Sequence, residues 1–302
     1  MRGTQKFMQS SQNIKTTLTF EMRHDRMGSK TQLVMGVWAM ANYFNVSWCT
    51  RRNPFIDIFD FKICAPDIYF PVNLTAIKMH QPGMFMIPGG DDDQPRSTFA
   101  PWNVISKFEK VAPGAVWGKG MARQWNRKIV NAARQLGAAK PWKHSADRLY
   151  VAVHVRRGDI VNNKAYAHAW ISDERFNFAI SQILRYCKRF NKKVEVHLFS
   201  EETPGYYWNK FQHIDKFHLA THQKQTVNTV KLNVKDWIGF IDADVLLVGG
   251  TFSAVPALAR EPPNTQGLPL TLYWEDKIGY FDRRSFMPSY WTTVKNITQQ
   301  SA

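Results

Sequence analysis

Two arginines, a glycine and an aspartate follow a largely apolar run near the middle of the chain. The run covers residues 151–155 and is followed by Arg156, Arg157, Gly158 and Asp159. Such a run is typical of a buried parallel strand, and ligands of open α/β sheets bind at the carboxyl ends of strands. A guanidinium stays charged and forks onto phosphate oxygens, each charge-assisted bond contributing roughly 1.5–3 kcal/mol. The segment predicts a phosphate site, the alternative being a structural salt bridge from one arginine to Asp159.

A second polar group stands where a later apolar run gives way to a helix. Thr251, Phe252 and Ser253 follow Gly249 and Gly250, and a helix is expected from about residue 254 to 260. Hydroxyls and backbone N–H groups at the start of a helix converge on an anion. The alternative is an ordinary helix N-cap without a ligand.

Both segments carry a resemblance to a known family. Residues 154–159, His-Val-Arg-Arg-Gly-Asp, resemble the H-x-R-R-x-D motif of the GDP-fucose-dependent fucosyltransferases, and are closest to the α1,2 group, whose relatives include the α1,6 and protein O-fucosyltransferases. Residues 236–253 are similar to the family's later motif, an Ala-Asp pair, an apolar strand and then Thr/Ser-Phe-Ser. The resemblance is good over residues 149–259, and residues 50–140 are unmatched.

The resemblance implies roles for individual residues. Arg156 is expected to contact the β-phosphate of the donor with Arg157 secondary, and Asp159 to order the loop. The catalytic candidates are therefore Arg156 and Asp159, and the donor-binding candidates are His154, Arg156, Arg157, Asp236, Thr251, Phe252, Ser253, Gly28 and Ser29. Asp236 is the candidate for reading guanine, since a carboxylate accepts from both N1–H and N2–H. Gly28 and Ser29 belong to a loop that loosely matches the family's early Gly-rich segment.

The implied reaction is an inverting transfer of fucose from GDP-fucose to a hydroxyl of a glycan or glycoprotein. Negative charge then builds on the β-phosphate, and donors such as Arg156 stabilise it, so no metal or other cofactor is required. The general base stays unassigned, because the relatives' glutamate beyond the double arginine has no counterpart here. The candidates for it are Asp159, Asp25, His24 and the acidic run 91–93.

Two other function classes compete with this interpretation. Asp242 and Asp244 form a D-x-D, the signature with which another class of glycosyltransferase holds Mn²⁺ or Mg²⁺ on a nucleotide diphosphate. That alternative leaves the arginine pair unexplained. The third class is a non-catalytic polyanion-binding protein, suggested by the net charge of +16 and the 11 Trp and 20 Phe. No pattern of a known nucleic-acid motif supports it, so no nucleic-acid partner is expected.

The order of the expected elements indicates an α/β fold. Strands and helices alternate, which implies βαβ units and parallel sheets. The expected strands are 16–20, 149–155, 194–200, 217–221 and 237–249, and the expected helices are 31–44, with Ser29 or Thr31 as the N-cap, 121–136, 172–190 and 205–211. With the resemblance, this predicts a GT-B-like fold of two Rossmann-type, doubly wound domains facing across a cleft, an acceptor-side domain at 1–145 and a nucleotide-sugar domain at 146–302.

Composition and targeting signals limit the setting. The 302 residues are 44% apolar, enough for a sizeable core. No apolar run is long enough to span a membrane and no signal peptide is evident. The three cysteines show no spacing typical of a zinc site, and a disulfide between Cys49 and Cys64 is an alternative that the sequence leaves undecided. Asparagines 45, 73 and 296 fit the glycosylation sequon. The expected compartment is the Golgi or secretory lumen if a eukaryotic anchor is missing from the chain, and otherwise the cytoplasm.

Overall fold

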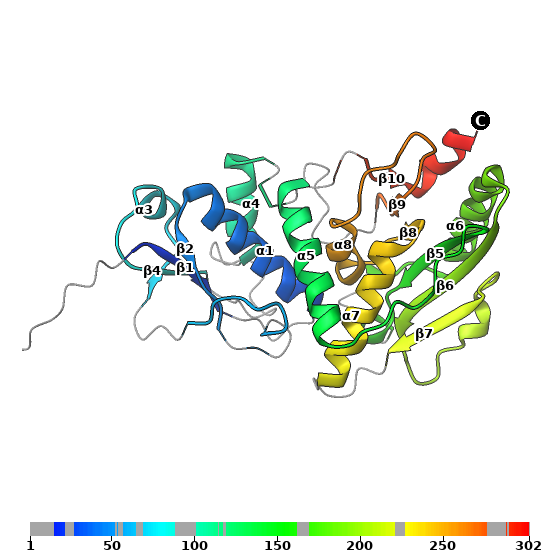
Figure 1. The fold of residues 1–302 in the computed structure, drawn as a ribbon, viewed down its shortest axis with the longest axis horizontal. Helices are drawn as coiled ribbons and strands as arrows, with labels where there is room; N and C mark the ends of the chain where they lie inside the picture. Colours follow the sequence, from blue (N-terminus) through cyan, green and yellow to red (C-terminus); the bar gives the residue numbers. More distant parts are fainter. Residues whose placement is uncertain are drawn as a thin grey trace, which may run out of the picture. The chain divides into compact units, whose positions relative to one another are not determined.

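The chain divides into two compact units, each built on a parallel sheet (Figure 1). The computed structural model describes residues 15–21, 27–51, 53, 57–64, 69–87, 101–113, 115–116, 119–161, 169–220, 227–276, 288 and 290–301. The first unit comprises Met1–His24, Leu33–Arg52 and Phe61–Pro113, and the second comprises Asp25–Gln32, Asn53–Asp60 and Gly114–Ala302. The α/β class predicted from the sequence is confirmed.

The first unit holds a four-stranded sheet in the order β2-β1-β4-β3, with every neighbouring pair parallel. Its strands are β1 (Thr17–Phe20), β2 (Ser47–Trp48), β3 (Phe70–Pro71) and β4 (Met84–Ile87), and its helices are α3 (Leu74–Lys78), α4 (Pro101–Val111) and, from Leu33 onward, α1 (Met27–Phe44). Helix α1 connects β1 to β2 and α3 connects β3 to β4, so both are crossovers between parallel strands. The strand expected at 16–20 is confirmed as β1.

Helix α1 begins earlier than the sequence predicts. It starts at Met27, so Gly28, Ser29 and Thr31 lie within it and neither Ser29 nor Thr31 is its N-cap. Thr31 is fully buried and its hydroxyl donates to the carbonyl of Met27, 2.7 Å away. Apolar residues of the following turns are buried, and this packing sets the extent of the helix.

A disulfide ties two neighbouring segments of the first unit together. Cys49 and Cys64 are bonded, with their Cα atoms 5.7 Å apart. Thr50 forms an isolated parallel bridge with Ile63, and its backbone N–H donates to the carbonyl of Lys62. The Cys49–Cys64 disulfide, which the sequence left undecided, is therefore present.

The second unit holds a six-stranded, fully parallel sheet in the order β10-β9-β8-β5-β6-β7. The strands are β5 (Arg148–Val155), β6 (Lys193–Glu201), β7 (Lys216–Ala220), β8 (Val245–Leu247), β9 (Leu270–Tyr273) and β10 (Thr292–Thr293). The chain builds outward from β5 through β6 to β7, then returns to the other side of β5 and builds through β8, β9 and β10. This is the strand order of dinucleotide-binding domains, and its switch point lies between β5 and β8.

Helices cover both faces of this second sheet. On one face, α6 (Asp173–Cys187) and η7 (Val294–Ser301) bury a core with the odd-numbered apolar residues of β5. On the other face lie α7 (Val227–Asp242) and α8 (Thr251–Ala257), whose Phe240 and Phe252 rings contact His154 of β5. The even-numbered residues of β5 therefore face α7, because side chains alternate along a strand.

Most element predictions in the second unit are confirmed, with three differences. The helix expected at 205–211 is reduced to the 3-10 helix η4 (Trp208–Lys210). The apolar run 237–249 is not one strand, because α7 continues to Asp242 and only Val245–Leu247 forms β8. The helix α5 (Lys119–Gln135), which matches the basic helix expected at 121–136, belongs to the second unit, so that unit begins ahead of residue 146. Helix α5 packs on α7, which joins it to the second unit.

Candidate functional site

The carboxyl ends of β5 and β8 meet at the switch point of the second sheet. Val153 of β5 pairs with Leu247 of β8, and both strands end within two residues of that pair. Arg156 follows β5 directly, and Gly249 and Gly250 follow β8. At a switch point the segments that follow the two strands run to opposite faces of the sheet, which leaves a crevice where ligands bind.

Two glycines let the strand ends come close together. A Cβ at Gly249 would lie 1.8 Å from the carbonyl oxygen of His154, which no side chain tolerates. A Cβ at Gly250 would lie 3.3 Å from Cδ of Arg156. The stem of Arg156 therefore lies against the backbone of Gly250, beside the start of α8, and the pair of glycines is needed for this approach.

Arg156 belongs to the α7 face of the sheet. His154, two residues earlier, contacts the rings of Phe240 and Phe252 at centroid distances of 5.7 and 5.6 Å. Strand alternation places Arg156 on the same face as His154. Arg156 is half-buried, so its stem is covered and the residue reaches solvent. This is the position that the sequence predicted for a phosphate-binding arginine.

His154 and Ser253 contribute to the structure of the crevice rather than to a free ligand surface. Ser253 is fully buried, and its hydroxyl lies 2.8 Å from Nδ1 of His154 and accepts from the N–H of Gly249 at 3.1 Å. The same hydroxyl donates to the carbonyl of Gly250. These bonds join the end of β8 to β5. That Ser253 and His154 also contact the donor stays a prediction.

Thr251 and Phe252 open helix α8. Gly250 is the N-cap and no side chain caps the helix, so the alternative of a hydroxyl cap is not realised. The ring of Phe252 packs against His154, Trp237 and Phe240 at centroid distances between 5.6 and 5.9 Å, which makes it part of the core behind the site. Thr251 is half-buried and is the member of this group that remains a candidate contact.

Arg157 points to the opposite face and is fully buried. Its guanidinium forms a 2.6 Å ion pair with Asp173 of α6, donates to the hydroxyl of Tyr206 at 2.9 Å and donates to the carbonyl of Arg156 at 2.8 Å. The ring of Trp170 lies 4.2 Å from its Cζ. Arg157 therefore bonds the backbone of Arg156 from the α6 side of the sheet, and its secondary contact to the donor stays a prediction.

Gly158 has a conformational role in the same loop. Its φ is +43°, in the left-handed region that favours glycine, and its N–H donates to the hydroxyl of Thr203 at 3.2 Å. Asp159 lies in the short helix Gly158–Ile160, and its side chain lies outside the described part of the molecule. Arg157 forms its ion pair with Asp173, and the salt bridge considered for Asp159 involves a side chain outside the described residues.

Helix α7 brings two buried polar side chains toward the crevice. Asp236 and Asn233 lie one and two turns before Phe240 on the stripe that faces the sheet. Helix α7 runs antiparallel to the strands because it connects parallel β7 and β8, so these earlier turns lie toward the carboxyl edge. Asp236 and Asn233 are 8% and 4% exposed, and burial raises the pKa of Asp236 to about 8. Oδ1 of Asn233 has no hydrogen-bond partner among the described residues.

Glu201 was missed by the sequence analysis. Val155 pairs with Ser200 in the β5–β6 ladder, so the next step of the register sets Arg156 opposite Glu201 at the end of β6. Phe199, two residues before Glu201, contacts Phe240 at 4.9 Å, which places Glu201 on the α7 face as well. The signal was available only from pairing, because 45 residues separate the two side chains in sequence.

The D-x-D pair lies at the other edge of the sheet. Asp242 is bonded to Nζ of Lys140 and to Nε2 of His144, each at 2.6 Å. Asp244 accepts from the backbone N–H of Tyr150 at 2.8 Å, just before β8 begins. The two carboxylates thus serve the amino ends of the strands, away from the crevice. Within the described residues, no three His, Cys, Asp or Glu side chains are grouped to hold a metal ion.

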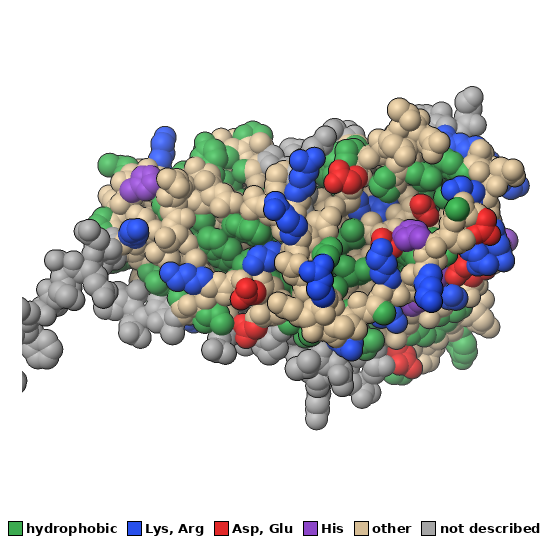
Figure 2. Space-filling model, viewed as in Figure 1, with side chains coloured by type: hydrophobic (Ala, Val, Ile, Leu, Met, Phe, Trp, Pro, Cys, Tyr) green, Lys and Arg blue, Asp and Glu red, His purple; other side chains and the backbone are tan. Residues whose placement is uncertain are grey.

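The remaining sequence candidates are only partly described. Gly28 and Ser29 lie in the first turn of α1, and the Ser29 side chain is outside the described residues. The base candidates His24, Asp25 and 91–93 also lie outside them. Among the described helices, none has the length and apolar character needed to cross a membrane. Figure 2 shows Lys and Arg side chains over α5, where Arg123, Arg127 and Arg134 are exposed.

The chain is similar to a solved structure of a known protein. No protein-family model and no curated protein matches the chain. A solved structure of an Arabidopsis thaliana FUT1 mutant in complex with GDP is similar to it with a TM-score of 0.41 and 9% sequence identity, over 86% of this chain and 73% of that chain. At this identity and TM-score, the likeness identifies neither a family nor an activity.

Proposed function

We propose that the second unit binds a nucleotide sugar through Arg156 and that the chain is an inverting glycosyltransferase, moving fucose from GDP-fucose to a hydroxyl of a glycan or glycoprotein. The observation that carries the proposal is the place of Arg156: it stands in an H-x-R-R-x-D segment and directly follows β5 at the switch point of a parallel sheet. Each of these facts favours a diphosphate ligand independently of the other.

Arg156 would act on the leaving group. The acceptor oxygen forms a bond to the anomeric carbon while the bond from that carbon to the β-phosphate oxygen breaks, and the electron pair leaves with GDP. A fixed guanidinium beside the β-phosphate stabilises this growing charge, and such preorganised donors contribute about 10²–10³ in rate. The bonds from Arg157 to the carbonyl of Arg156 keep the loop in position. No metal ion is needed for this stabilisation.

Asn233 and Asp236 are the proposed contacts to the base. Guanine presents two adjacent donors, N1–H and N2–H, and an ionised carboxylate accepts both, so GDP binding is expected to release the proton that burial holds on Asp236 below about pH 8. The position of Asp236 on the sheet-facing stripe of α7 supports this assignment, as does its lack of any hydrogen bond or ion pair within the described residues. A buried carboxylate without a partner destabilises a fold, so its presence favours a functional role.

Glu201 is the proposed proton acceptor. The β5–β6 register sets Glu201 opposite Arg156 and on the same face of the sheet. Among the described strand pairs, no other carboxylate is brought next to Arg156. Glu201 would take the proton of the acceptor hydroxyl as the new bond forms. Positioned bases of this kind contribute about 10²–10⁴ in rate.

Calorimetry with GDP, GDP-fucose, GDP-mannose and UDP-sugars, each with and without EDTA, tests the donor assignment. Arg156→Ala is expected to weaken GDP binding by about 10- to 150-fold, the loss of one charge-assisted bond. Arg185→Ala, at an exposed arginine of α6, is the matched control and is expected to bind GDP like the native chain. Glu201→Gln is expected to keep GDP binding and to lose most of the transfer or donor-hydrolysis rate.

Three results would overturn parts of the proposal. Binding that requires Mn²⁺ and tolerates Arg156→Ala would return the site to Asp242 and Asp244. Tighter binding of UDP-sugars than of GDP-fucose would overturn the guanine assignment. Full activity of Glu201→Gln would remove Glu201 as the base while leaving the donor site intact.

A further inference from the structure

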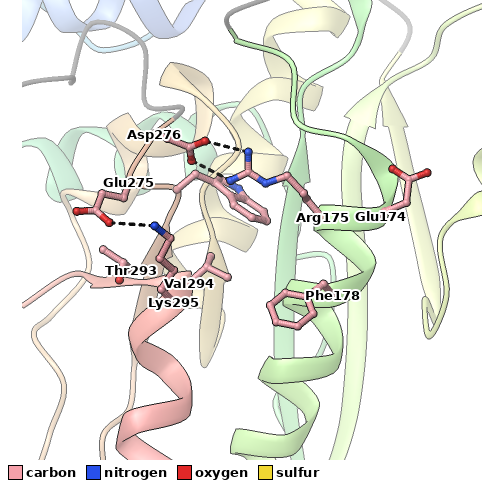
Figure 3. Close-up of a pocket in the computed structure, with 9 residues that line it drawn as sticks. Glu174, Arg175, Phe178, Glu275, Asp276, Thr293, Val294 and Lys295 are labelled. Atoms are coloured by element: carbon pink, nitrogen blue, oxygen red, sulfur yellow. Dashed lines mark hydrogen bonds and ion pairs between the residues drawn. The ribbon is translucent and has the colours of Figure 1, made fainter.

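A second cavity lies on the α6 face of the second sheet, away from the face that carries Arg156. It encloses about 320 Å³ and is formed by the start of α6, the residues after β9 and the start of η7 (Figure 3). Its lining includes Arg175 and Phe178 of α6, Trp274 and Asp276 after β9, Thr293 of β10 and Lys295 of η7. Trp274 belongs to the core between the sheet and α6. The cavity is therefore separate from the proposed donor site.

The charged groups around the cavity neutralise one another. Arg175 forms two bonds with the Asp276 carboxylate at 2.8 and 3.0 Å, and Lys295 lies 3.7 Å from Glu275. Figure 3 shows one pair joining α6 to the residues after β9 and the other joining those residues to η7, with the carboxylate of Glu174 directed away from both. On a chain with a net charge of +16, this frame has no excess of positive charge. A phosphate or other anion gains little there.

The same cavity has an apolar surface. Phe178 is one turn after Arg175 on α6 and is 59% exposed, although it is a large aromatic residue. Its neighbours in the cavity are Val294 and Trp274, which are 6% and 4% exposed. An aromatic face carries partial negative charge and attracts the polarised C–H groups of a ligand stacked on it. The cavity thus offers one flat apolar surface with polar groups at its edge.

Two lining residues also hold buried polar atoms without partners. The hydroxyl of Thr293 and Nε1 of Trp274 make no hydrogen bond among the described residues. Buried polar atoms are usually hydrogen-bonded, so both favour a ligand that brings hydroxyl groups. A purely apolar ligand would leave both atoms without a hydrogen bond.

We infer that this cavity binds a sugar ring of an uncharged oligosaccharide. A pyranose has an apolar face of C–H groups to stack on Phe178, and its hydroxyls both donate to the carboxylates and accept from Arg175, Lys295 and Thr293. The cavity volume lies at the small end of the range for ligand sites, which suits one sugar unit. The site is non-catalytic: it holds a glycan while the reacting hydroxyl is elsewhere. This inference does not depend on the GDP-fucose assignment.

An oligosaccharide array with neutral tri- and tetrasaccharides and their sulfated forms tests the inference on the full chain. The native protein is expected to retain neutral oligosaccharides with or without GDP. Phe178→Ala removes the stacking surface and is expected to weaken the best of these at least tenfold, and Thr293→Val, which keeps the side-chain shape, by several-fold. Tyr207→Ala, at a 68% exposed aromatic of the same unit that does not line the cavity, is the control and is expected to bind as the native chain does.

Calorimetry with GDP on the same four proteins separates this inference from the proposed function. Unchanged GDP binding together with weakened oligosaccharide binding in Phe178→Ala supports a separate site. Three results would overturn it: no retention of any neutral oligosaccharide, stronger retention of the sulfated forms, or equal retention by native protein and Phe178→Ala. If the native chain binds neutral oligosaccharides but does not bind GDP, the donor proposal is overturned and the oligosaccharide inference stands.

Discussion

The two arginines of the H-x-R-R-x-D segment have different environments although they are adjacent in sequence. Alternation along β5 turns Arg156 toward α7 and the crevice, and it turns Arg157 into the core beside α6. The guanidinium of Arg157 is satisfied by Asp173, Tyr206 and the carbonyl of Arg156. The segment therefore turns one arginine toward the crevice, where we propose the ligand binds, and bonds the next to the backbone of the first.

Asp236 makes the proposed base site testable through pH. Its pKa is about 8 in the folded chain and close to 4 in the unfolded chain, so between these values the folded state holds a proton that the unfolded state has lost. Stability is thus expected to fall as pH rises from 4 to 8. Asp236→Asn removes this dependence and should exceed the native chain in stability by an amount that grows across the window, by ~1.4 kcal/mol for each unit of pKa difference.

Chemical denaturation at pH 5, 6.5 and 8 measures the change, and GDP calorimetry measures its functional counterpart. Asp236→Asn is expected to be more stable at pH 8 and to bind GDP more weakly. Asp147→Asn is the control: Asp147 is exposed, and a hydrogen bond from Ser145 lowers its pKa, so its replacement is not expected to stabilise the chain at any of these pH values. Equal stability of Asp236→Asn and the native chain at pH 8 would contradict the burial of an ionisable, unpartnered carboxylate.

At the scale of elements, the crevice depends on the close approach of β5 and the end of β8. Gly249→Ala puts a Cβ onto the His154 carbonyl, and because that atom is backbone, no rotamer change relieves the overlap. The strand ends must then separate. We expect a loss of about 1–3 kcal/mol in the free energy of unfolding, typical of overpacking, and weaker GDP binding as Arg156 shifts.

Gly120→Ala provides the matched comparison, since a Cβ there meets nothing within 4 Å and the position lies in helix α5. Gly120→Ala is expected to leave the free energy of unfolding unchanged or to raise it by about 0.4–1 kcal/mol. Thermal unfolding and GDP calorimetry on the two variants distinguish a local clash from a general intolerance of glycine replacement. If Gly249→Ala unfolds and binds GDP like Gly120→Ala, the close approach has no role in the site.

Helices and strands were predicted correctly where the spacing of apolar residues changes sharply along the sequence. Their bounds were predicted less well where one apolar run continues into the next. The strand expected at 149–155 is β5, and the helix after Ser172 is α6, with the Ser172 hydroxyl accepting from the N–H of Arg175 as its N-cap. The run 237–249 was assigned wrongly because the buried face of α7 and the buried strand β8 are both apolar, and a continuous apolar run does not separate the two.

The candidate site was predictable in its centre and not in its surroundings. Arg156 was identified because its chemistry and its place after a strand are both local properties. The buried role of Arg157 depends on Asp173 and Tyr206, 16 and 49 residues away, and the position of Glu201 depends on strand pairing. Neither spacing leaves a sequence pattern. The switch point likewise required the strand order, which the sequence alone does not determine.

At the scale of the whole molecule, the three cysteines divide between the units in a way that allows each unit to be perturbed separately. The Cys49–Cys64 bond lies in the first unit and closes a sequence separation of 15 residues. By the loop-entropy estimate, such a bond stabilises its unit by about 3 kcal/mol. Cys187 lies in the second unit, fully buried in α6, and burial raises the pKa of its thiol to about 12.

Thiol titration and thermal unfolding test this arrangement. Without reductant, the native chain is expected to show no reactive thiol and the denatured chain one, that of Cys187, because the thiolate is the reactive form and burial suppresses it. Reduction should expose the other two and lower the unfolding temperature of the first unit, while GDP binding by the second unit stays within a factor of two. A Cys49→Ser and Cys64→Ser double variant should reproduce the effect of reduction. If reduction instead abolishes GDP binding while the second unit remains folded, the nucleotide site does not reside in that unit alone, and the assignment to Arg156, Asp236 and Glu201 is incomplete.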